Sequence, residues 1–133
     1  MVEMPPKMVL LVASLVLGFG GAAAAHHSNA AYDSDHLQTM EGTVKAVNWT
    51  NPHISFVVAK DVKSGEPAST WVFEVSSPGV LTRSGWTKRS LQPGDHAVFR
   101  YAPLRDGRPG GYLHKAILPS GQELTYSLTP AEQ

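Results

Sequence analysis

The stretch His53-Ile-Ser-Phe-Val-Val-Ala-Lys60 decides the fold. Its alternate residues Ile54, Phe56 and Val58 are apolar, whereas the residues between them include both polar and apolar side chains. Successive side chains of a strand point to opposite faces, so these three side chains share one face of an extended chain. The stretch is therefore predicted to be a β-strand that buries this face and turns His53 towards the opposite side.

The same period of two occurs in the segments on either side, 40–49 and 69–75. Met40, Gly42, Val44 and Ala46 share one face and alternate with polar residues, which predicts a half-buried strand. A turn at 50–52 and a Gly-containing loop at 61–66 join the three segments, since Pro, Asn and Gly favour turns. Three consecutive strands with short connections indicate an antiparallel meander.

The pattern changes at Ser77-Pro78, which is typical of a helix N-cap followed by Pro in the first turn, so a short helix is predicted over 78–86. Further strands are predicted at 96–101 and 112–118, joined by a flexible hairpin tip at 105–111, with a final extended piece at 123–127. Five strands with a helix after the third is the element order of an OB-type barrel. The predicted fold is all-β: a small antiparallel OB-like five-stranded barrel with one short helix. Its expected core comprises Val44, Ile54, Phe56, Val58, Trp71, Phe73, Val98 and Ile117.

The first 25 residues form a different kind of sequence. Lys7 precedes an apolar run from Met8 to Phe19, and small Gly and Ala residues follow as far as Ala25. This order is typical of a secretory signal peptide. The alternative is an uncleaved membrane anchor, although spanning a bilayer takes about 20 predominantly apolar residues. We expect a cleaved signal and a periplasmic or secreted protein with no stable membrane insertion after processing.

The chain of 133 residues has 11 Lys+Arg, 11 Asp+Glu and no Cys. Balanced charge argues against a nucleic-acid partner, because such binding depends on cations that neutralise phosphates. The lack of Cys excludes disulfides and thiolate metal sites. The expected organisation is a signal peptide at 1–25, a flexible N-terminal arm at 26–38, an OB-like barrel domain at 39–128 and a C-terminal tail at 129–133.

Histidines at the expected new N-terminus are candidate copper ligands. Cleavage after Ala25 makes His26 the first residue, whose amine and imidazole can chelate one copper ion, with a further His completing a histidine brace. Cleavage after Ala24 places His27 third, where an amine, two backbone amides and an imidazole can enclose Cu(II) in a square plane. The alternative is a solvated His pair that binds nothing specifically.

His53 is the third candidate metal ligand, because it follows Asn51-Pro52 at the start of a strand. Its other interpretation is a His that only hydrogen-bonds a loop carbonyl. No paired acid and base, nucleophile elbow or phosphate loop is present, so we expect no enzyme. Two functions stay open: a copper-binding protein that uses His26, His27 and His53, or a metal-free periplasmic binding module for a small ligand or a protein partner.

Short motifs occur along nearly the whole of the chain after the expected signal. They are Ala25-His-His-Ser28, Glu41-Gly-Thr-Val44, Trp49-Thr-Asn-Pro-His53, Ser77-Pro78, Arg83-Ser-Gly-Trp-Thr87, Ser90-Leu-Gln-Pro-Gly-Asp95 and Leu118-Pro-Ser-Gly121. In combination these motifs resemble the DUF6152 family of small exported bacterial proteins. The resemblance implies a periplasmic or secreted β-barrel-like domain of uncharacterised function, and it supplies no catalytic residues. It places a His pair after the signal and a His after Asn-Pro, as found here, whereas the segment Tyr32-Asp-Ser-Asp-His36 departs from the family pattern.

Overall fold

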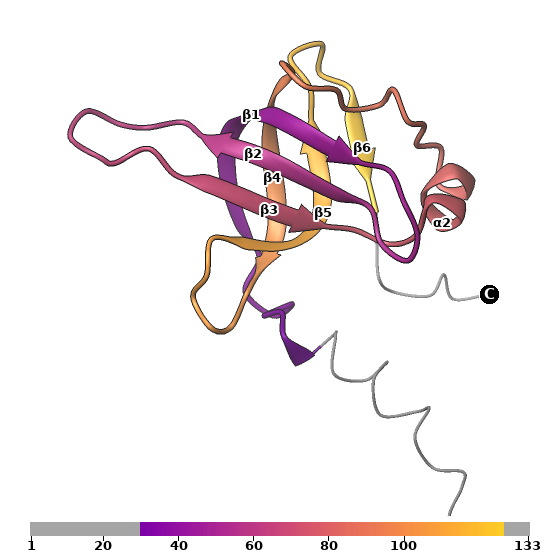
Figure 1. Cartoon of the computed structure of the whole chain (residues 1–133), viewed down its shortest axis with the longest axis horizontal. Coiled ribbons are helices and arrows are strands. Elements are labelled where there is room, and N and C mark those ends of the chain that lie inside the picture. Colours follow the sequence, from indigo (N-terminus) through magenta and orange to yellow (C-terminus); the bar gives the residue numbers. More distant parts are fainter. Residues whose placement is uncertain (1–29, 127–133) are drawn as a thin grey trace, which may run out of the picture.

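The computed structural model describes residues 30–126 (Figure 1). The predicted signal peptide at 1–25, the candidate ligands His26 and His27, and the tail at 129–133 lie outside this range. The elements within it follow the predicted order. They are β1 (Gln38–Asn48), β2 (Ser55–Lys60), β3 (Thr70–Glu74), α2 (Pro78–Arg83), β4 (His96–Pro103), β5 (Gly110–Ile117) and β6 (Glu123–Thr125).

The strands form one sheet in the order β3-β2-β1-β4-β5-β6, and a further pairing of β3 with β5 closes the first five into a barrel. The closing pair is parallel, whereas the other neighbouring strands are antiparallel. In Figure 1, β1, β2 and β3 lie in front of β4 and β5, and α2 sits at one end. The predicted OB-like barrel with a helix between its third and fourth strands is confirmed.

β1 carries an irregularity in its pairing with β2. Val44 pairs with Val58, but Ala46 pairs with Val57, so Lys45 is an extra residue in β1. Such a β-bulge changes which side chains point inward beyond it. Val47 therefore packs against the core and Ala46 turns outward, so the prediction that Ala46 shares the face of Met40, Gly42 and Val44 is wrong.

The helix begins as its sequence predicts. Ser77 is the N-cap and its hydroxyl accepts a hydrogen bond from the amide of Val80 at 3.3 Å, with Pro78 in the first turn. The helix ends at Arg83, earlier than predicted, and Trp86 follows in the connection to β4. The Trp86 side chain is only 1% exposed, so the aromatic ring fills this end of the barrel.

The barrel interior is an aromatic and aliphatic core. The rings of Phe73 and Phe99 stack with centroids 5.4 Å apart, and Phe73 also lies 4.8 Å from the ring of Tyr101. Of the expected core, Val44, Ile54, Phe56, Val58 and Phe73 are buried, which confirms the predicted register of β2.

The predicted burial of Val98, Ile117 and Trp71 is wrong in degree, since all three are half-buried. Ala97 and Phe99 are the β4 residues that point inward, at 2% and 0% exposure, so Val98 between them points outward. Ile117 is the partner of Val98 across the ladder and shares its outward direction. Trp71 points inward but lies where the barrel opens, against Phe73 and Tyr101.

Gly110 and Gly111 were expected in a flexible hairpin tip, and this expectation is wrong. Both begin β5 and are buried, where they pair with Val72 and Phe73 of β3. A Cβ on Gly110 would lie 2.5 Å from the carbonyl oxygen of Val72. The parallel closure thus requires residues without side chains, because the strands approach too closely for a Cβ.

Replacement of Phe56 by Ala tests the assignment of the core. Phe56 is 1% exposed and packs on Trp86, with ring centroids 6.2 Å apart, so its loss leaves a cavity. We expect Phe56→Ala to lower the free energy of unfolding by about 3–5 kcal/mol, measured by urea denaturation. Val57→Ala, at the neighbouring outward position, should cost about 1 kcal/mol or less. Equal costs at the two positions would contradict the register.

Candidate functional site

His53 is the one predicted metal ligand within the described residues. It is exposed in the connection between β1 and β2, next to the cis Asn51–Pro52 peptide. The amide of Ile54 donates to the carbonyl of Ser76 at 3.1 Å, which extends the β2–β3 pairing to Ile54. His53 was predicted to begin the strand, but β2 begins at Ser55, so His53 lies in the connection directly before the last bonded residue.

The described part of the N-terminal arm is attached to the opposite end of the barrel. The amide of Asp33 donates to the carbonyl of Pro103, and the amide of Arg105 donates to the carbonyl of Ala31, both at 2.9 Å. Tyr32 forms an isolated β-bridge with Leu104 between these bonds. The backbone of the arm thus runs beside the β4–β5 loop.

The side chain of Tyr32 contacts residues of β3 and β5 on the outer surface of the barrel. Its hydroxyl donates to Oε2 of Glu74 at 2.7 Å, and its ring lies 5.5 Å from that of Tyr112 in an edge-on arrangement. Glu74 pairs with Ser55 across β3 and β2. Burial, followed by the hydrogen bond to Glu74, raises the pKa of the Tyr32 hydroxyl well above its ordinary value, so Tyr32 stays a hydrogen-bond donor.

Further aromatic residues surround Tyr112 on β5. The rings of His114 and Tyr126 each lie 6.1 Å from the Tyr112 ring. Burial, and then the charge of Tyr126, raise the pKa of Tyr112. The Nε2 atom of His114 is buried and has no hydrogen-bond partner among residues 30–126. Burial, and then the Arg100 guanidinium, lower the pKa of His114, which favours the neutral imidazole.

Three polar side chains lie close together: Glu41 on β1, Asp61 directly after β2 and His96 at the start of β4. Ligand atoms of Glu41, Asp61 and His96 lie within 4.8 Å of one another, and all three residues are exposed. His96 Nε2 is 2.7 Å from Asp61 Oδ2, a hydrogen bond that accounts for this pair without a metal. In sequence His96 has no nearby partner, because the group forms only through the pairing of β1 with β4 and the Asp61–Glu41 backbone bond.

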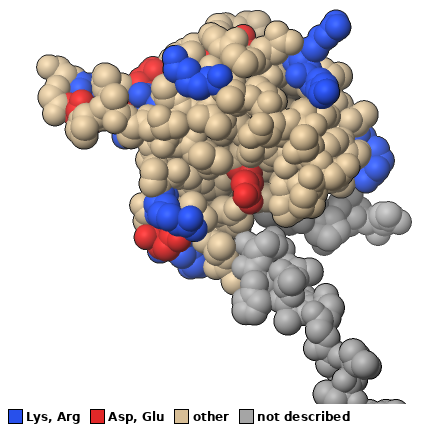
Figure 2. Space-filling model, viewed as in Figure 1, with Lys and Arg blue, Asp and Glu red and all other residues tan. Residues whose placement is uncertain are grey.

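The outer surface of β2 and β3 is poor in charge. Among the outward ladder positions of these two strands only Glu74 is ionisable, and Tyr32 is bonded to that carboxylate, whereas β1 adds the exposed Glu41 beside this surface. Val72 of β3 is 45% exposed on this surface. The bulge residue Lys45 belongs to β1, on the other side of β2. Figure 2 shows the charged groups mainly at the margins of this view. The outward positions of β2 and β3 are Ser55, Val57, Ala59, Thr70, Val72 and Glu74.

The fold and these surfaces define a small OB-type barrel with a charge-poor outer sheet. The chain belongs to a family of unknown function, DUF6152, whose model matches residues 13–131. Neither curated proteins nor solved structures gave a match to the chain. Within the part of the chain that the structure covers, no helix has the length and apolar character needed to cross a membrane.

The lowered pKa of His114 predicts how stability depends on pH. The unfolded chain binds a proton at this site near the ordinary pKa of about 6.5, whereas the folded chain binds it only at lower pH. The stabilising effect of neutral His114 is therefore complete above about pH 6.5 and is lost as the pH falls. We expect the free energy of unfolding to decrease between pH 7.5 and pH 5, and less so in His114→Gln. The exposed His53→Gln serves as a matched control, and an unchanged pH dependence in His114→Gln would refute the assignment.

Proposed function

We propose that the protein is exported and acts as a binding module for a protein partner, which it contacts through the outer surface of β2 and β3. The observation that carries this proposal is the charge-poor surface around Val72, which is 45% exposed. The centres of protein interfaces are depleted of charged residues, so such a surface loses little solvation when it is covered. OB barrels use the face of their second and third strands for ligands, a likeness of fold that adds support.

The chemistry of this surface favours a polypeptide over a nucleic acid. A phosphate backbone requires Lys or Arg for affinity, and the outward positions of β2 and β3 carry neither. Val57 and Val72 face one another across the β2–β3 ladder, so their side chains form a continuous apolar strip. A partner with its own apolar residues would complement this strip.

Site-specific cross-linking in producing cells tests the proposal. A photoreactive p-benzoylphenylalanine at Val72 should yield one dominant adduct of discrete mass with a protein partner. The same residue at Val62, which is 52% exposed in the loop after β2, is the matched control and should yield none. Val57→Lys should abolish the adduct from position 72 by placing a charge in the interface. Equal adducts from both positions, or none from position 72, would reject the proposed surface.

A second proposal is copper binding by the processed N-terminus together with His53. It is supported by the contact of the Tyr32 side chain with Glu74, because Glu74 pairs with Ser55, two residues after His53, so one side chain of the arm lies near the start of β2. A free α-amine has a pKa of about 7.7–8.0, so a metal ion can displace its proton near neutral pH. Nitrogen ligands suit Cu(II), and the sequence has no Cys to compete.

Copper titration followed by electron paramagnetic resonance tests this second proposal. The protein recovered from outside the cytoplasm should have lost 24 or 25 residues by intact mass, if the signal is cleaved after Ala24 or Ala25. We expect it to bind Cu(II) at least tenfold more tightly than a form with an extra N-terminal Met. His53→Ala should change the spectrum if His53 completes the site. Equal affinity of the authentic and extended forms would exclude the N-terminal site, and an unchanged spectrum in His53→Ala would exclude the brace.

A further inference from the structure

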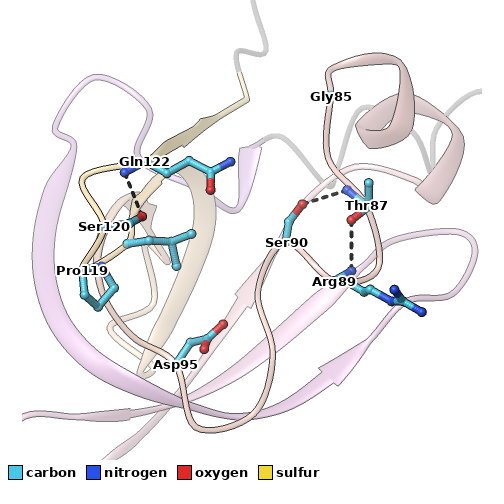
Figure 3. A pocket seen from close by; sticks show the side chains of 9 residues that line it. Gly85, Thr87, Arg89, Ser90, Asp95, Pro119, Ser120 and Gln122 are labelled. Atoms are coloured by element: carbon cyan, nitrogen blue, oxygen red, sulfur yellow. Dashed lines mark hydrogen bonds between the residues drawn. The ribbon is translucent and has the colours of Figure 1, made fainter.

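A polar pocket lies at the end of the barrel beside α2, apart from the outer surface of β2 and β3. One wall is the connection from α2 to β4, and the other is the turn between β5 and β6 (Figure 3). The cavity measures about 520 Å³, within the range of about 300–1,000 Å³ that is usual for small-molecule sites.

The first wall is bonded to β6 and β1, and the second is a turn closed by backbone bonds of Leu118 with Gln122 and Gly121, both at 2.9 Å. The indole nitrogen of Trp86 donates to the carbonyl of Thr125 at 3.1 Å, which joins the first wall to β6. Val44 of β1 accepts from the amide of Gly94 and donates to the carbonyl of Asp95, both at 2.8 Å. The pocket is therefore preformed, and a ligand would not have to order its walls.

Hydroxyl groups on both walls have protons available to a ligand. The Ser90 hydroxyl accepts from the amide of Thr87 at 2.8 Å, and the Thr87 hydroxyl accepts from the amide of Arg89 at 3.1 Å. On the other wall the Ser120 hydroxyl accepts from the amide of Gln122 at 3.3 Å. Each oxygen is held in place by the bond that it accepts, which leaves its own O–H free to donate.

The pocket also provides acceptors, and it has little net charge. Asp95 accepts from the amide of Gln92 through Oδ2 at 2.8 Å, so its second oxygen remains an acceptor. Figure 3 shows the side chains of Asp95 and Gln122 directed into the space between the walls, whereas the Arg89 guanidinium points away. An anionic ligand would meet the Asp95 carboxylate. Asp95 and Arg89 are the two ionisable residues of the lining, and their opposite charges leave the pocket without a net charge that would favour a cation.

We propose that this pocket binds a neutral molecule with several hydroxyl groups, of the class of a sugar unit. Each sugar hydroxyl both donates and accepts, which matches the mixture of hydroxyl donors, one carboxylate and one amide. Leu118 and Pro119 supply apolar atoms for the C–H groups of a sugar ring. This binding is independent of the partner surface around Val72.

Amide resonances of the isotopically labelled protein, followed during titration, provide the test. The probes are glucose and N-acetylglucosamine, with gluconate and glucosamine as charged analogues. Neutral sugars should cause saturable shifts at residues 85–95 and 118–122 and bind more tightly than either charged analogue. Tighter binding of cellotriose than of glucose would indicate a unit within a glycan, and equal binding would indicate a free sugar.

Matched variants decide whether the pocket itself binds. Gln122→Ala should weaken binding at least fivefold, whereas Gln92→Ala, an equally exposed substitution outside the pocket, should leave it unchanged. Asp95→Asn keeps an oxygen to accept from the Gln92 amide and should weaken binding through the loss of charge. The proposal is overturned if neutral sugars cause no saturable shifts, if the shifts lie outside these residues, if a charged analogue binds more tightly, or if Gln122→Ala binds as the unaltered protein does.

Discussion

The close approach of β5 to its neighbours at Gly110 and Gly111 is the constraint on which the barrel depends. A Cβ at Gly110 would meet the Val72 carbonyl, and one at Gly111 would meet the Ala102 carbonyl. Without this approach β3 and β5 could not pair, and the sheet would stay open. Closure encloses the stacked rings of Phe73 and Phe99, so the buried aromatic core depends on Gly110 at the pairing with β3 and on Gly111 at the pairing with β4.

Closure also determines which surfaces are left for binding. Inward positions are filled by the core, so a ligand can meet only the outer sheet, the loops or the barrel ends. Trp86 fills the end beside α2, and its bond to Thr125 holds the wall of the polar pocket. The arm occupies the surface beside β4 and β5 through Tyr32. Separate surfaces thus remain for a large partner and for a small polar molecule.

Period-two patterns predicted the meander and the buried face of β2, and the pair Ser77-Pro78 predicted the helix start, because each depends on neighbours in sequence. The predictions failed where both faces of a strand carry apolar residues, and where a residue has no side chain to contribute to the pattern. In β4 both faces carry apolar residues, so Val98 looked as suitable for the core as Phe99, which is the buried one. Gly110 has no side chain to contribute to a hydrophobic pattern. The Gly and Pro residues around it predicted a turn, whereas the structure begins β5 there. The group of Glu41, Asp61 and His96 depends on strand register, which no local motif encodes.

The bulge at Lys45 determines which β1 side chains face the core and which face the outer sheet beside the proposed partner surface. Strict alternation beyond Val44 would point Ala46 inward and Val47 outward. The extra residue reverses these directions, so Val47 joins the core and Ala46 stands beside Val57 on the outer sheet. One irregularity therefore adds a larger side chain to the interior and leaves a small, uncharged one outside. A surface that a partner can cover thus arises from the same backbone feature that completes the packing within the barrel.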